Sequence, residues 1–273
     1  MQSYFFIPAS RLQNLKKIKK SKPNFIIIDF EDAIIEKDID IYFKELHLIE
    51  NHQSYWYRLP VRSDFDNDVD LKYIQKFKDN GINLIILPKL KSAAELITIC
   101  EKFQDIKFIV LIEHPKLLLE MRFALMMDYN KNLKNIIGLA LGSHDLTTFL
   151  NAKHEENQLD YPRKELLYIA KAYDFVAIDI ASMEIFNKEK FNNEVKNGID
   201  NGYNAKFIIH PKQLEWLKTN KQNEEDTFWA KNILSKLPEN YNGEDFAPFV
   251  FNKEVIEKPH ALKALEILKK NTK

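Results

Sequence analysis

The stretch that decides the fold is "NLIILPKLKSAAELITICEKFQDIKFIVLIEHP", residues 83–115. It holds two short apolar runs, 83–88 and 107–113, which are rich in Ile and Leu and are too short for helices. Between them, helical spacing joins four apolar residues, Ala93, Leu96, Ile97 and Cys100. A strand, a helix and a second strand in this order predict parallel pairing with a right-handed crossover.

Similar apolar runs recur along the chain, at 3–8, 24–30, 55–59, 83–88, 107–113, 135–142, 174–180 and 206–211. Such strand and helix units in roughly 220 residues predict an α/β fold, the (β/α)8 TIM barrel, whose usual size is about 250 residues. The alternative is an open doubly wound sheet, which normally has a glycine-rich phosphate turn after its first strand. That turn reads "IPASR" here, at residues 7–11.

Composition excludes several classes of function. The six glycines form no G-x-G-x-x-G motif, P-loop or nucleophile elbow, which disfavours nucleotide-binding and serine-hydrolase functions. With 40 basic and 40 acidic residues, no global field favours nucleic acid or a membrane surface as a partner. No apolar run approaches the ~18 residues of a membrane span. Because the single Cys100 cannot form an internal disulfide and the N-terminus lacks a signal-peptide pattern, we expect a cytoplasmic protein.

Two domains are expected. Residues 1–236 would form the catalytic barrel, and residues 237–273 a linker followed by a terminal helix. The linker reads "PENYNGEDFAP", which is polar and turn-rich. The terminal helix would present one apolar stripe, Leu262, Leu265 and Leu268. Because the eight barrel units are already complete, we expect this extension to cover an active-site mouth, its own or that of a neighbouring subunit.

Charged residues collect where the predicted strands end. In barrels of this kind the active site lies at the C-terminal ends of the strands. The charged residues at these ends are Arg11, Asp29, Glu31, Asp32, Arg58, Lys89, Glu113, Asp145 and Asp179. If their carboxylates face one basin, mutual repulsion raises their pKa values unless a cation lies among them. A buried strand that ends on Glu113 therefore predicts a bound cation.

Magnesium is the cation that fits hard oxygen ligands without clustered cysteines. Glu113 and Asp145 follow adjacent strands and could converge on one ion; the alternative for both is a salt bridge to Arg58 or Lys89. Asp29 and Glu31 share a face if their strand continues. Asp32 would orient ligands or, alternatively, cap the following helix.

Zinc is the competing metal, because three histidines also lie near strand ends, His114, His144 and His210. However, no H-x-H pair ends the first strand. His210 precedes Pro211, which favours a role in the turn that enters the next helix.

Seven short motifs occur in an order that resembles the HpcH/HpaI aldolase and citrate lyase β-subunit superfamily, in its citryl-, malyl- and citramalyl-CoA lyase-like branch. They are "FFIPASR", "IIIDFEDAI", "YRLP", "ILPKLKSAAEL", "LIEHP", "LALGSHDL" and "AKFIIHPKQL". The closest match is "IIIDFEDAI", residues 26–34, to the family's L-D-L-E-D-A-V. The resemblance covers essentially the whole chain.

The resemblance implies roles for individual residues. Glu113 and Asp145 would be the magnesium ligands, Glu31 and Asp32 would hold the metal's waters, and Arg58 would contact substrate oxygens. The family's C-terminal segment crosses to a neighbouring subunit of a homotrimer and carries a catalytic Asp. In this chain "VIEKP" puts Glu257 in that place.

The sequence therefore predicts a Mg²⁺-dependent carbon–carbon lyase that cleaves a hydroxy-acyl, possibly coenzyme A-linked, or hydroxy or 2-oxo acid substrate through an enolate-like transition state. Arg58 and Glu257 would be catalytic, Asp29 would join Glu31 and Asp32 around the metal site, and Arg11, Lys89 and Asp179 would bind substrate. A thioester hydrolase using the same metal, or a non-catalytic acid- or acyl-binding subunit, are the alternatives. Four departures from the family motifs bear on coenzyme A binding, Ala9, Pro60, Lys91 and Ala205.

Overall fold

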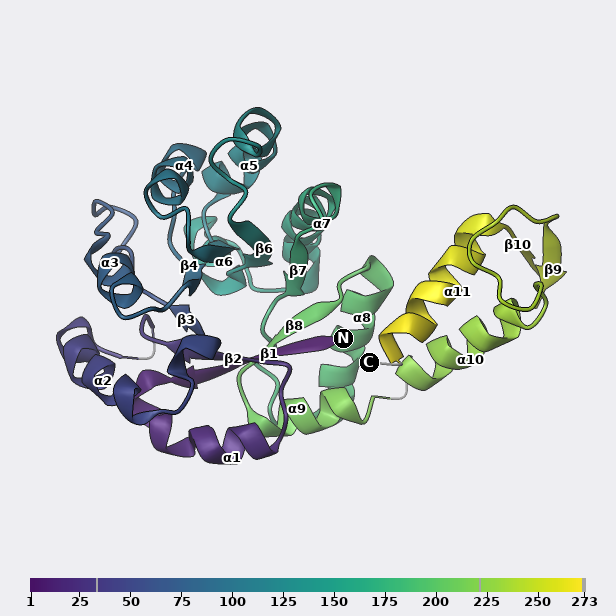
Figure 1. Cartoon of the computed structure of the whole chain (residues 1–273), viewed down its shortest axis with the longest axis horizontal. Coiled ribbons are helices and arrows are strands. Elements are labelled where there is room, and N and C mark those ends of the chain that lie inside the picture. Colours follow the sequence, from purple (N-terminus) through teal and green to yellow (C-terminus); the bar gives the residue numbers. More distant parts are fainter. Residues whose placement is uncertain (33, 221, 272–273) are drawn as a thin grey trace. The chain divides into compact units, whose positions relative to one another are not determined.

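The computed structural model describes residues 1–32, 34–220 and 222–271. In this part of the chain, parallel strands close into a barrel in the order β1 to β8, and β8 pairs back onto β1 (Figure 1). They are β1 (Gln2–Pro8), β2 (Phe25–Asp29), β3 (Trp56–Arg58), β4 (Leu84–Leu87), β5 (Lys107–Ile112), β6 (Ile136–Leu141), β7 (Val176–Asp179) and β8 (Ala205–Ile208). The predicted (β/α)8 barrel is confirmed, and the open-sheet alternative is wrong because β1 and β8 close the sheet.

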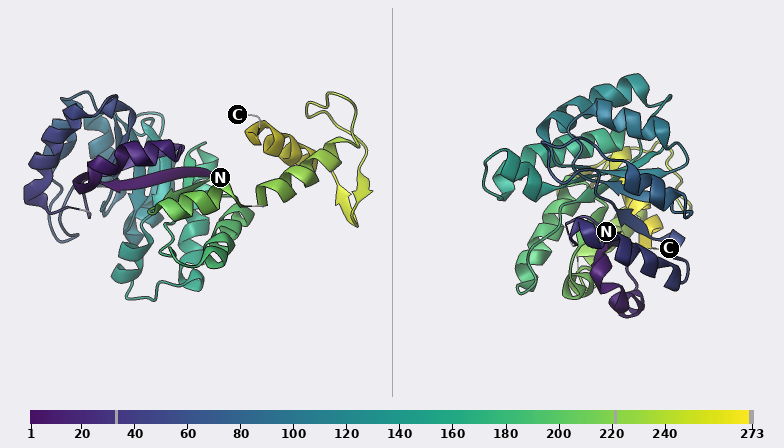
Figure 2. Two further views of the ribbon diagram at one scale, coloured as in Figure 1. Left: turned by 90° about the horizontal axis from the view of Figure 1, so that it is seen from below. Right: turned by 90° about the vertical axis from the view of Figure 1, so that its left-hand side faces the viewer.

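Helices surround the strands, as the views in Figure 1 and Figure 2 show. The α-helices are α1 (Leu15–Lys20), α2 (Ile39–Glu45), α3 (Lys72–Lys78), α4 (Ala93–Lys102), α5 (Pro115–Asp128), α6 (Ser143–Phe149), α7 (Glu156–Ala172), α8 (Lys188–Asn201) and α9 (Pro211–Lys218). Short 3-10 helices lie at η1 (Ala9–Asn14), η2 (Glu36–Asp38), η3 (Leu46–Leu48) and η4 (His52–Ser54). Each crossover helix packs an apolar face against the strands, which fixes where each strand ends.

Two apolar layers hold the barrel together. Alternate residues along a strand point to opposite faces, so one set fills the barrel and the other packs under the helices. The inner layer includes Tyr4, Ile27, Trp56, Ile109 and Phe207. The outer layer is larger, and it includes Cys100, whose burial raises the pKa of its thiol to about 12. Such a thiol is packing rather than a nucleophile.

Strand register sets the level of the charged residues at the C-terminal end of the barrel. Asp29 on β2 lies opposite Arg58 on β3, and Ile112 on β5 lies opposite Leu141 on β6. The residues that follow, Glu113 and Gly142, therefore leave neighbouring strands at the same height. The backbone N–H of Gly142 donates to the Ile112 carbonyl at 2.9 Å, which extends this pairing by one step.

The chain forms two compact units, Met1–Leu217 (unit 1) and Lys218–Lys273 (unit 2). In unit 2, α10 (Gln222–Leu234) packs on α11 (Lys258–Asn271), and β9 (Phe249–Phe251) pairs antiparallel with β10 (Glu254–Ile256). Residues 222–234, which the sequence groups with the barrel, thus belong to the α10–α11 pair. The role expected for residues 237–273 as a cover over a mouth remains a prediction.

The buried stripe of α11 differs from the expected one. Ala261 and Ala264 are buried, whereas Leu262 is 44% exposed. Ile267 and Leu268 complete the packed face against α10. Small alanines allow two helix backbones to approach closely. The expected stripe is therefore correct for Leu268, but Ala261 and Ala264 take the buried positions expected for Leu262 and Leu265.

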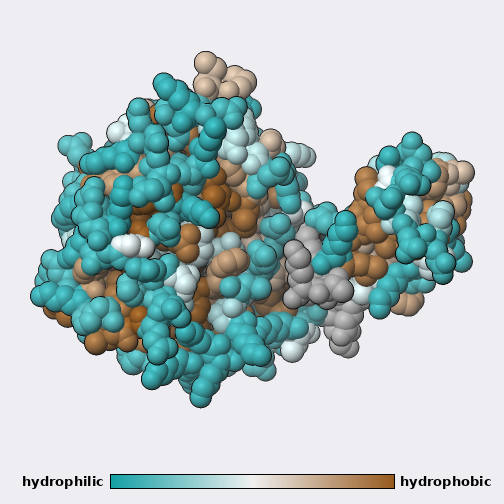
Figure 3. Space-filling view, in the orientation of Figure 1, coloured by the Kyte–Doolittle hydropathy of each residue, from teal (hydrophilic) through white to brown (hydrophobic). Residues whose placement is uncertain are grey.

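On the face shown in Figure 3, hydrophilic residues predominate and hydrophobic residues are exposed between them. None of the helices within 1–32, 34–220 and 222–271 combines the length and apolarity that a membrane crossing requires.

Candidate active site

A cavity of about 290 Å³ opens at the C-terminal ends of the barrel strands. Its charged and polar lining comes from β2, β3, β5 and β6 and the turns after them, and includes Asp29, Asp32, Arg58, Glu113, His144 and Asp145. The structure therefore brings together four of the predicted carboxylates, Asp29, Asp32, Glu113 and Asp145, with the predicted catalytic arginine. Glu31 and Lys89 line an adjoining cavity, to which Asp32 also belongs.

Glu113 is the most deeply buried acid of the site, with 1% of its surface exposed. Its Oε2 accepts one hydrogen bond, from the backbone N–H of Lys89 at 2.5 Å. Burial, together with the nearby charges of Glu31 and Asp145, raises the pKa of the Glu113 carboxyl well above its usual range. Among the described residues Glu113 forms no ion pair, so the salt bridge considered as its alternative partner is not seen.

Gly142 makes the room that the Glu113 carboxylate occupies. A Cβ at residue 142 would lie 2.2 Å from the Cγ of Glu113 and 2.5 Å from its Oε1. Gly142 has φ −82°, so its absence of a side chain serves this close approach and not an unusual backbone angle. The steric relation between Gly142 and Glu113 depends on the pairing of β5 with β6, which the sequence alone does not show.

Asp145 lies in the first turn of α6, half-buried, and lines the same cavity as Glu113. Counting Asp29, Glu31, Asp32, Glu113 and Asp145 against Arg58 and Lys89, five carboxylates face two cations, an excess of three negative charges when all are ionised. In the described part of the chain no group of three or more His, Cys, Asp or Glu side chains forms a complete metal cage. Two carboxylates with room beside them fit Mg²⁺, which keeps waters and takes substrate oxygens as its other ligands.

Arg58 is held by three carboxylates. Its Nε and Nη2 donate to the two oxygens of Asp29, both at 2.7 Å, in a bidentate pair. Its Nη1 lies 3.0 Å from an oxygen of Glu31 and 3.0 Å from an oxygen of Asp32. Burial opposes the charge on Arg58, but these partners outweigh burial and raise the pKa of the guanidinium. The arginine is therefore a fixed cation.

Glu31 and Asp32 connect Arg58 to Lys89. The Nζ of Lys89 lies 2.5 Å from Glu31 and 3.2 Å from Asp32. Burial raises the pKa of Glu31 to about 7, although Arg58 and Lys89 pull it down. Burial also favours a higher pKa for Asp32, but the positive charges of Arg58 and Lys89 have the larger combined effect and lower its pKa. Asp32 caps no helix, because η2 begins after Ile35 without a side-chain cap.

Lys89 adopts a left-handed backbone, with φ 51°. A non-glycine residue pays for this conformation, and such strain is concentrated at functional sites. Here the conformation turns the Lys89 N–H toward Glu113 while its side chain reaches Glu31. One residue thus holds the buried acid of β5 and the acidic turn after β2.

Two predicted substrate-binding residues lie elsewhere. Arg11 is exposed in η1 and is not part of the lining of the cavity. Asp179 ends β7, but it points away from the barrel interior, because its neighbour Ile178 belongs to the inner apolar layer. Strand alternation then places Asp179 on the helix-facing side. The expectation that Asp179 faces the basin is therefore wrong.

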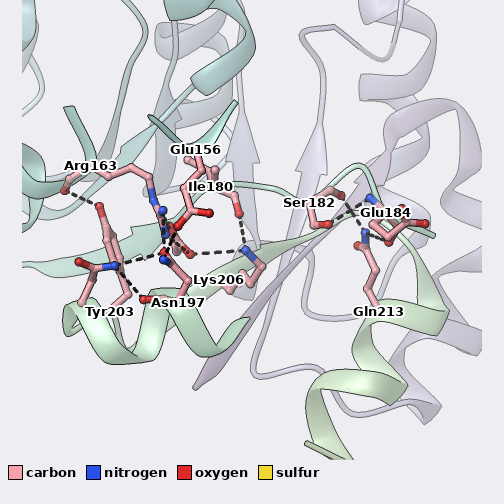
Figure 4. A network of polar contacts seen from close by, with 11 residues as sticks. Glu156, Arg163, Ile180, Ser182, Glu184, Asn197, Tyr203, Lys206 and Gln213 are labelled. Carbon is pink, nitrogen blue, oxygen red and sulfur yellow. Dashed lines mark hydrogen bonds and ion pairs between the residues drawn. The ribbon is translucent and has the colours of Figure 1, made fainter. Parts of the chain in front are cut away.

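Asp179 is instead the centre of a buried ion network, whose other members Arg163, Asn197 and Lys206 are labelled in Figure 4. The Nε of Arg163 on α7 donates to its Oδ1 at 3.0 Å, and the Nη2 of Arg163 lies 2.9 Å from the same oxygen. The Nζ of Lys206 on β8 lies 3.5 Å from its Oδ2. The exposed fractions of Asp179 and Lys206 are 1% and 0%. Asn197 on α8 accepts from Arg163 at 2.9 Å and completes the network.

Lys206 and Gln213 hold the turn that follows β7, a role the sequence did not reveal. The Nζ of Lys206 donates to the Ile180 carbonyl at 2.8 Å. The Nε2 of Gln213 donates to the carbonyls of Ser182 at 2.8 Å and Glu184 at 3.0 Å (Figure 4). Both donors are fully buried. Their presence in "AKFIIHPKQL" is the one signal in the sequence that could have directed attention to them.

The histidines do not gather into a zinc site. His114 accepts from the Lys116 N–H at the start of α5, and His210 accepts from the Lys212 N–H at the start of α9. His144 lines the cavity but stacks on His154, with ring centroids 3.9 Å apart. His210 therefore takes the turn-fixing role that the sequence favours.

Glu257 belongs to unit 2, where it is exposed and immediately precedes α11. Its backbone N–H donates to the Nδ1 of His260 at 3.1 Å, and its carbonyl accepts from the N–H of His260 at 2.9 Å. Its side chain is thus presented at a helix start, and its catalytic role remains a prediction.

We predict that Gly142→Ala destabilises the protein by about 1–3 kcal/mol, because the new methyl overlaps the Glu113 side chain. Urea unfolding measures the loss. In a Glu113→Ala background the same change should cost clearly less, since the overlap is gone. If the two single losses simply add in the double variant, the steric explanation is wrong.

We predict that Asp179→Asn costs about 3–5 kcal/mol of unfolding free energy, because it leaves two buried cations without their carboxylate. Magnesium affinity of the folded protein should not change. The control is Asp160→Asn, which breaks an exposed pair with Lys164 and should cost under about 0.5 kcal/mol. Adding Lys206→Met to Asp179→Asn should recover part of the loss. An Asp179→Asn protein as stable as the control would contradict the network's structural role.

Two solved structures illustrate the match of this fold to known proteins. CitE of Mycobacterium tuberculosis, solved with magnesium, acetoacetate and coenzyme A, matches with a TM-score of 0.80 at 19% identity, over 100% of this chain and 98% of that one. RipC of Yersinia pestis matches with a TM-score of 0.64 at 23% identity, over 80% of this chain and 94% of that one. At these identities the matches establish the fold.

Sequence relatives have related but different activities in their names. The (3S)-malyl-CoA thioesterase of Cereibacter sphaeroides is 24% identical over 78% of this chain and 74% of its own length. The mitochondrial citramalyl-CoA lyase of Homo sapiens is 24% identical over 94% of this chain and 82% of its own. The family model described as HpcH/HpaI aldolase/citrate lyase matches residues 2–211, which span β1 to the start of α9 and include every residue lining the cavity. This chain therefore belongs to the HpcH/HpaI aldolase/citrate lyase family.

Proposed function

We propose that this protein is a magnesium-dependent carbon–carbon lyase acting on a hydroxy-acyl thioester or on a hydroxy or 2-oxo acid. The observation that carries the proposal is the buried carboxylate of Glu113, which shares a cavity with Asp145 and has no cationic partner of its own among the described residues. Citrate lyase-type relatives solved with magnesium support the choice of metal. Glu113 and Asp145 would hold the ion, with Asp29, Glu31 and Asp32 around it.

Arg58 would bind the reacting oxygen. A guanidinium has five N–H donors. Four contacts to carboxylates are present, through Nε, Nη2 and twice through Nη1. Two of these contacts are hydrogen bonds, from Nε and Nη2 to Asp29, and the contacts of Nη1 are ion pairs. Because the pair with Asp29 orients the guanidinium before substrate arrives, the second N–H of Nη2 would be available to stabilise developing negative charge.

The reaction is a retro-aldol or retro-Claisen cleavage. The substrate hydroxyl loses its proton, the carbon–carbon bond next to it breaks, and its electron pair forms an enolate, which takes up one proton at carbon. When bound, Mg²⁺ would supply positive charge beside the carboxylate and oxygens of the substrate. Arg58 would stabilise the oxygen that gains charge, and Glu257 would move the proton.

Two further parts of the proposal rest on the family resemblance, and a third rests on the sequence. The C-terminal segment that carries Glu257 would act at the site of its own or a neighbouring subunit, within a homotrimer. Coenzyme A would carry the acyl group, as the names of the relatives indicate for those proteins. The reduced Cys100 and the balanced charge favour a cytoplasmic location.

Thioester hydrolysis is the second candidate, and the malyl-CoA thioesterase relatives favour it specifically. It would use the same metal residues and place less demand on Glu257. A non-catalytic acid-binding subunit is the third possibility, since one relative is named as the β subunit of citrate lyase in Haemophilus influenzae.

We predict that Glu113→Gln and Asp145→Asn each abolish magnesium binding, measured by calorimetry, because each removes a negative ligand oxygen. Glu101→Gln, an exposed change on α4, is the control and should bind like the native chain. Native protein that is folded but binds no magnesium at millimolar concentration would favour the non-catalytic subunit.

We predict that the protein cleaves (3S)-malyl-CoA or citramalyl-CoA into a 2-oxo acid and a shorter thioester without releasing free thiol. A hydrazine reagent detects the oxo acid, and a thiol reagent detects hydrolysis. Arg58→Lys should lower kcat at least ~10²-fold while changing magnesium affinity less than ~10-fold, because lysine keeps the charge but not the fork geometry. Thiol release that matches substrate loss would establish the hydrolase instead.

A further inference from the structure

The wall of the cavity has two chemically different halves. The half that carries the charged and polar side chains comes from β2, β3, β5 and β6, as described above, and it also includes Leu111 and Leu141. The other half comes from β7, β8 and β1, which are consecutive around the closed barrel. Its side chains are all apolar: Phe6, Pro8, Ala181, Met183, Phe207 and Ile209. We call this half the apolar arc.

Phe6 is where the two halves meet. The guanidinium carbon of Arg58 lies 5.1 Å from the centre of the Phe6 ring, in a cation–π contact. On its other side Phe6 packs edge-on against Phe207, with ring centroids 5.0 Å apart. An acid whose oxygens reach Arg58 therefore has the rest of its carbon skeleton beside Phe6 and Phe207.

Two members of the apolar arc are left open to solvent. Met183 is 54% exposed and Ile209 is 37% exposed, although both line the cavity. Large apolar side chains that border a cavity without being covered favour contact with an apolar ligand, because that contact removes both surfaces from water.

The apolar arc is also held rigidly. Ala181 and Met183 lie on the turn whose carbonyls at residues 180, 182 and 184 accept from the buried donors of Lys206 and Gln213. The backbone N–H of Ile209 donates to Oε1 of the same Gln213 at 3.0 Å. One glutamine thus fixes the two sides of the arc relative to each other, so little ordering cost is left for binding.

A second carboxylate on the ligand would find no partner in this half. Among the described residues that line the cavity, Arg58 is the sole Lys or Arg, and its charge is already paired with Asp29, Glu31 and Asp32. A carboxylate placed against Phe207 or Ile209 would lose its water without gaining a cation.

We propose that the acid recognised by this site carries an uncharged hydrocarbon substituent, which packs on the apolar arc, and that the 2-oxo acid product is accordingly an alkyl monocarboxylate and not a dicarboxylate. This inference rests on the proposed function and specifies its substrate class. The small volume of the cavity, about 290 Å³, limits the substituent to a few carbons.

The test is calorimetric titration of the full chain with 2-oxo acids in the presence of MgCl2. The alkyl series is pyruvate, 2-oxobutyrate and 2-oxopentanoate, and the matched dicarboxylate is 2-oxoglutarate, which has the chain length of 2-oxopentanoate. We expect Kd to fall by up to about fourfold for each added methylene, the usual gain for burying one. We expect 2-oxoglutarate to bind at least ~10-fold more weakly than 2-oxopentanoate.

A charge placed in the apolar arc should reverse this preference. Ile209→Arg should tighten 2-oxoglutarate binding relative to 2-oxopentanoate by at least ~10-fold, while pyruvate, which is too short to reach residue 209, changes little. The control is Leu119→Arg on α5, an exposed leucine outside the cavity, which should leave all four affinities unchanged.

The outcomes separate the two proposals. If pyruvate binds with magnesium but added methylenes give no gain, or 2-oxoglutarate binds as tightly as 2-oxopentanoate, the apolar substituent is wrong and the lyase proposal stands. If none of the four acids binds with magnesium, both proposals fail. Should Ile209→Arg not fold, the series measured on the native chain still decides.

Discussion

The buried charge of Glu113 is the constraint on which the site depends. A carboxylate with 1% exposure and a single backbone N–H as donor is costly in the interior of a protein. Its neighbours add to the cost, because Glu31 and Asp145 have the same sign. Gly142 leaves space for the Glu113 carboxylate. Arg58 does not neutralise Glu113, because it is paired with Asp29, Glu31 and Asp32. When ionised, the carboxylates of Glu113 and Asp145 therefore add unpaired negative charge to the cavity that they line.

The fold could be predicted from sequence because each strand and each crossover helix has its own local pattern. All eight strands overlap the runs seen in the sequence, and their ends agree within two residues except at β8, which ends three residues before its run does. The basin followed from the fold, since the ends of parallel strands meet at one edge. The prediction that charged residues at the strand ends face one basin was correct for Asp29, Arg58, Glu113 and Asp145, which line the same cavity.

The remaining parts could not be predicted because they depend on which face a residue takes and on what lies opposite. Asp179 ends a strand just as Asp29 does, but it lies on the opposite face of its own strand. The buried stripe of α11 differs from the expected one because it includes two alanines, Ala261 and Ala264, which carry little hydrophobic signal in the sequence. Gly142 makes room for Glu113, and Gln213 donates to the carbonyls of Ser182 and Glu184, which are distant in sequence, so residue type alone does not reveal these roles.

The strained backbone of Lys89 links two regions that are otherwise separate. Its N–H acts on the acid of β5, and its ammonium acts on the acidic turn after β2. A small rotation of this one peptide would weaken both the hydrogen bond to Glu113 and the ion pair with Glu31. The positions of these two acids are therefore coupled through Lys89. Replacing Lys89 with glycine would relieve the torsional cost yet forfeit the ammonium, and no natural side chain offers both benefits. Lysine at this position therefore combines an unfavourable backbone conformation with a side chain long enough to reach Glu31 and Asp32.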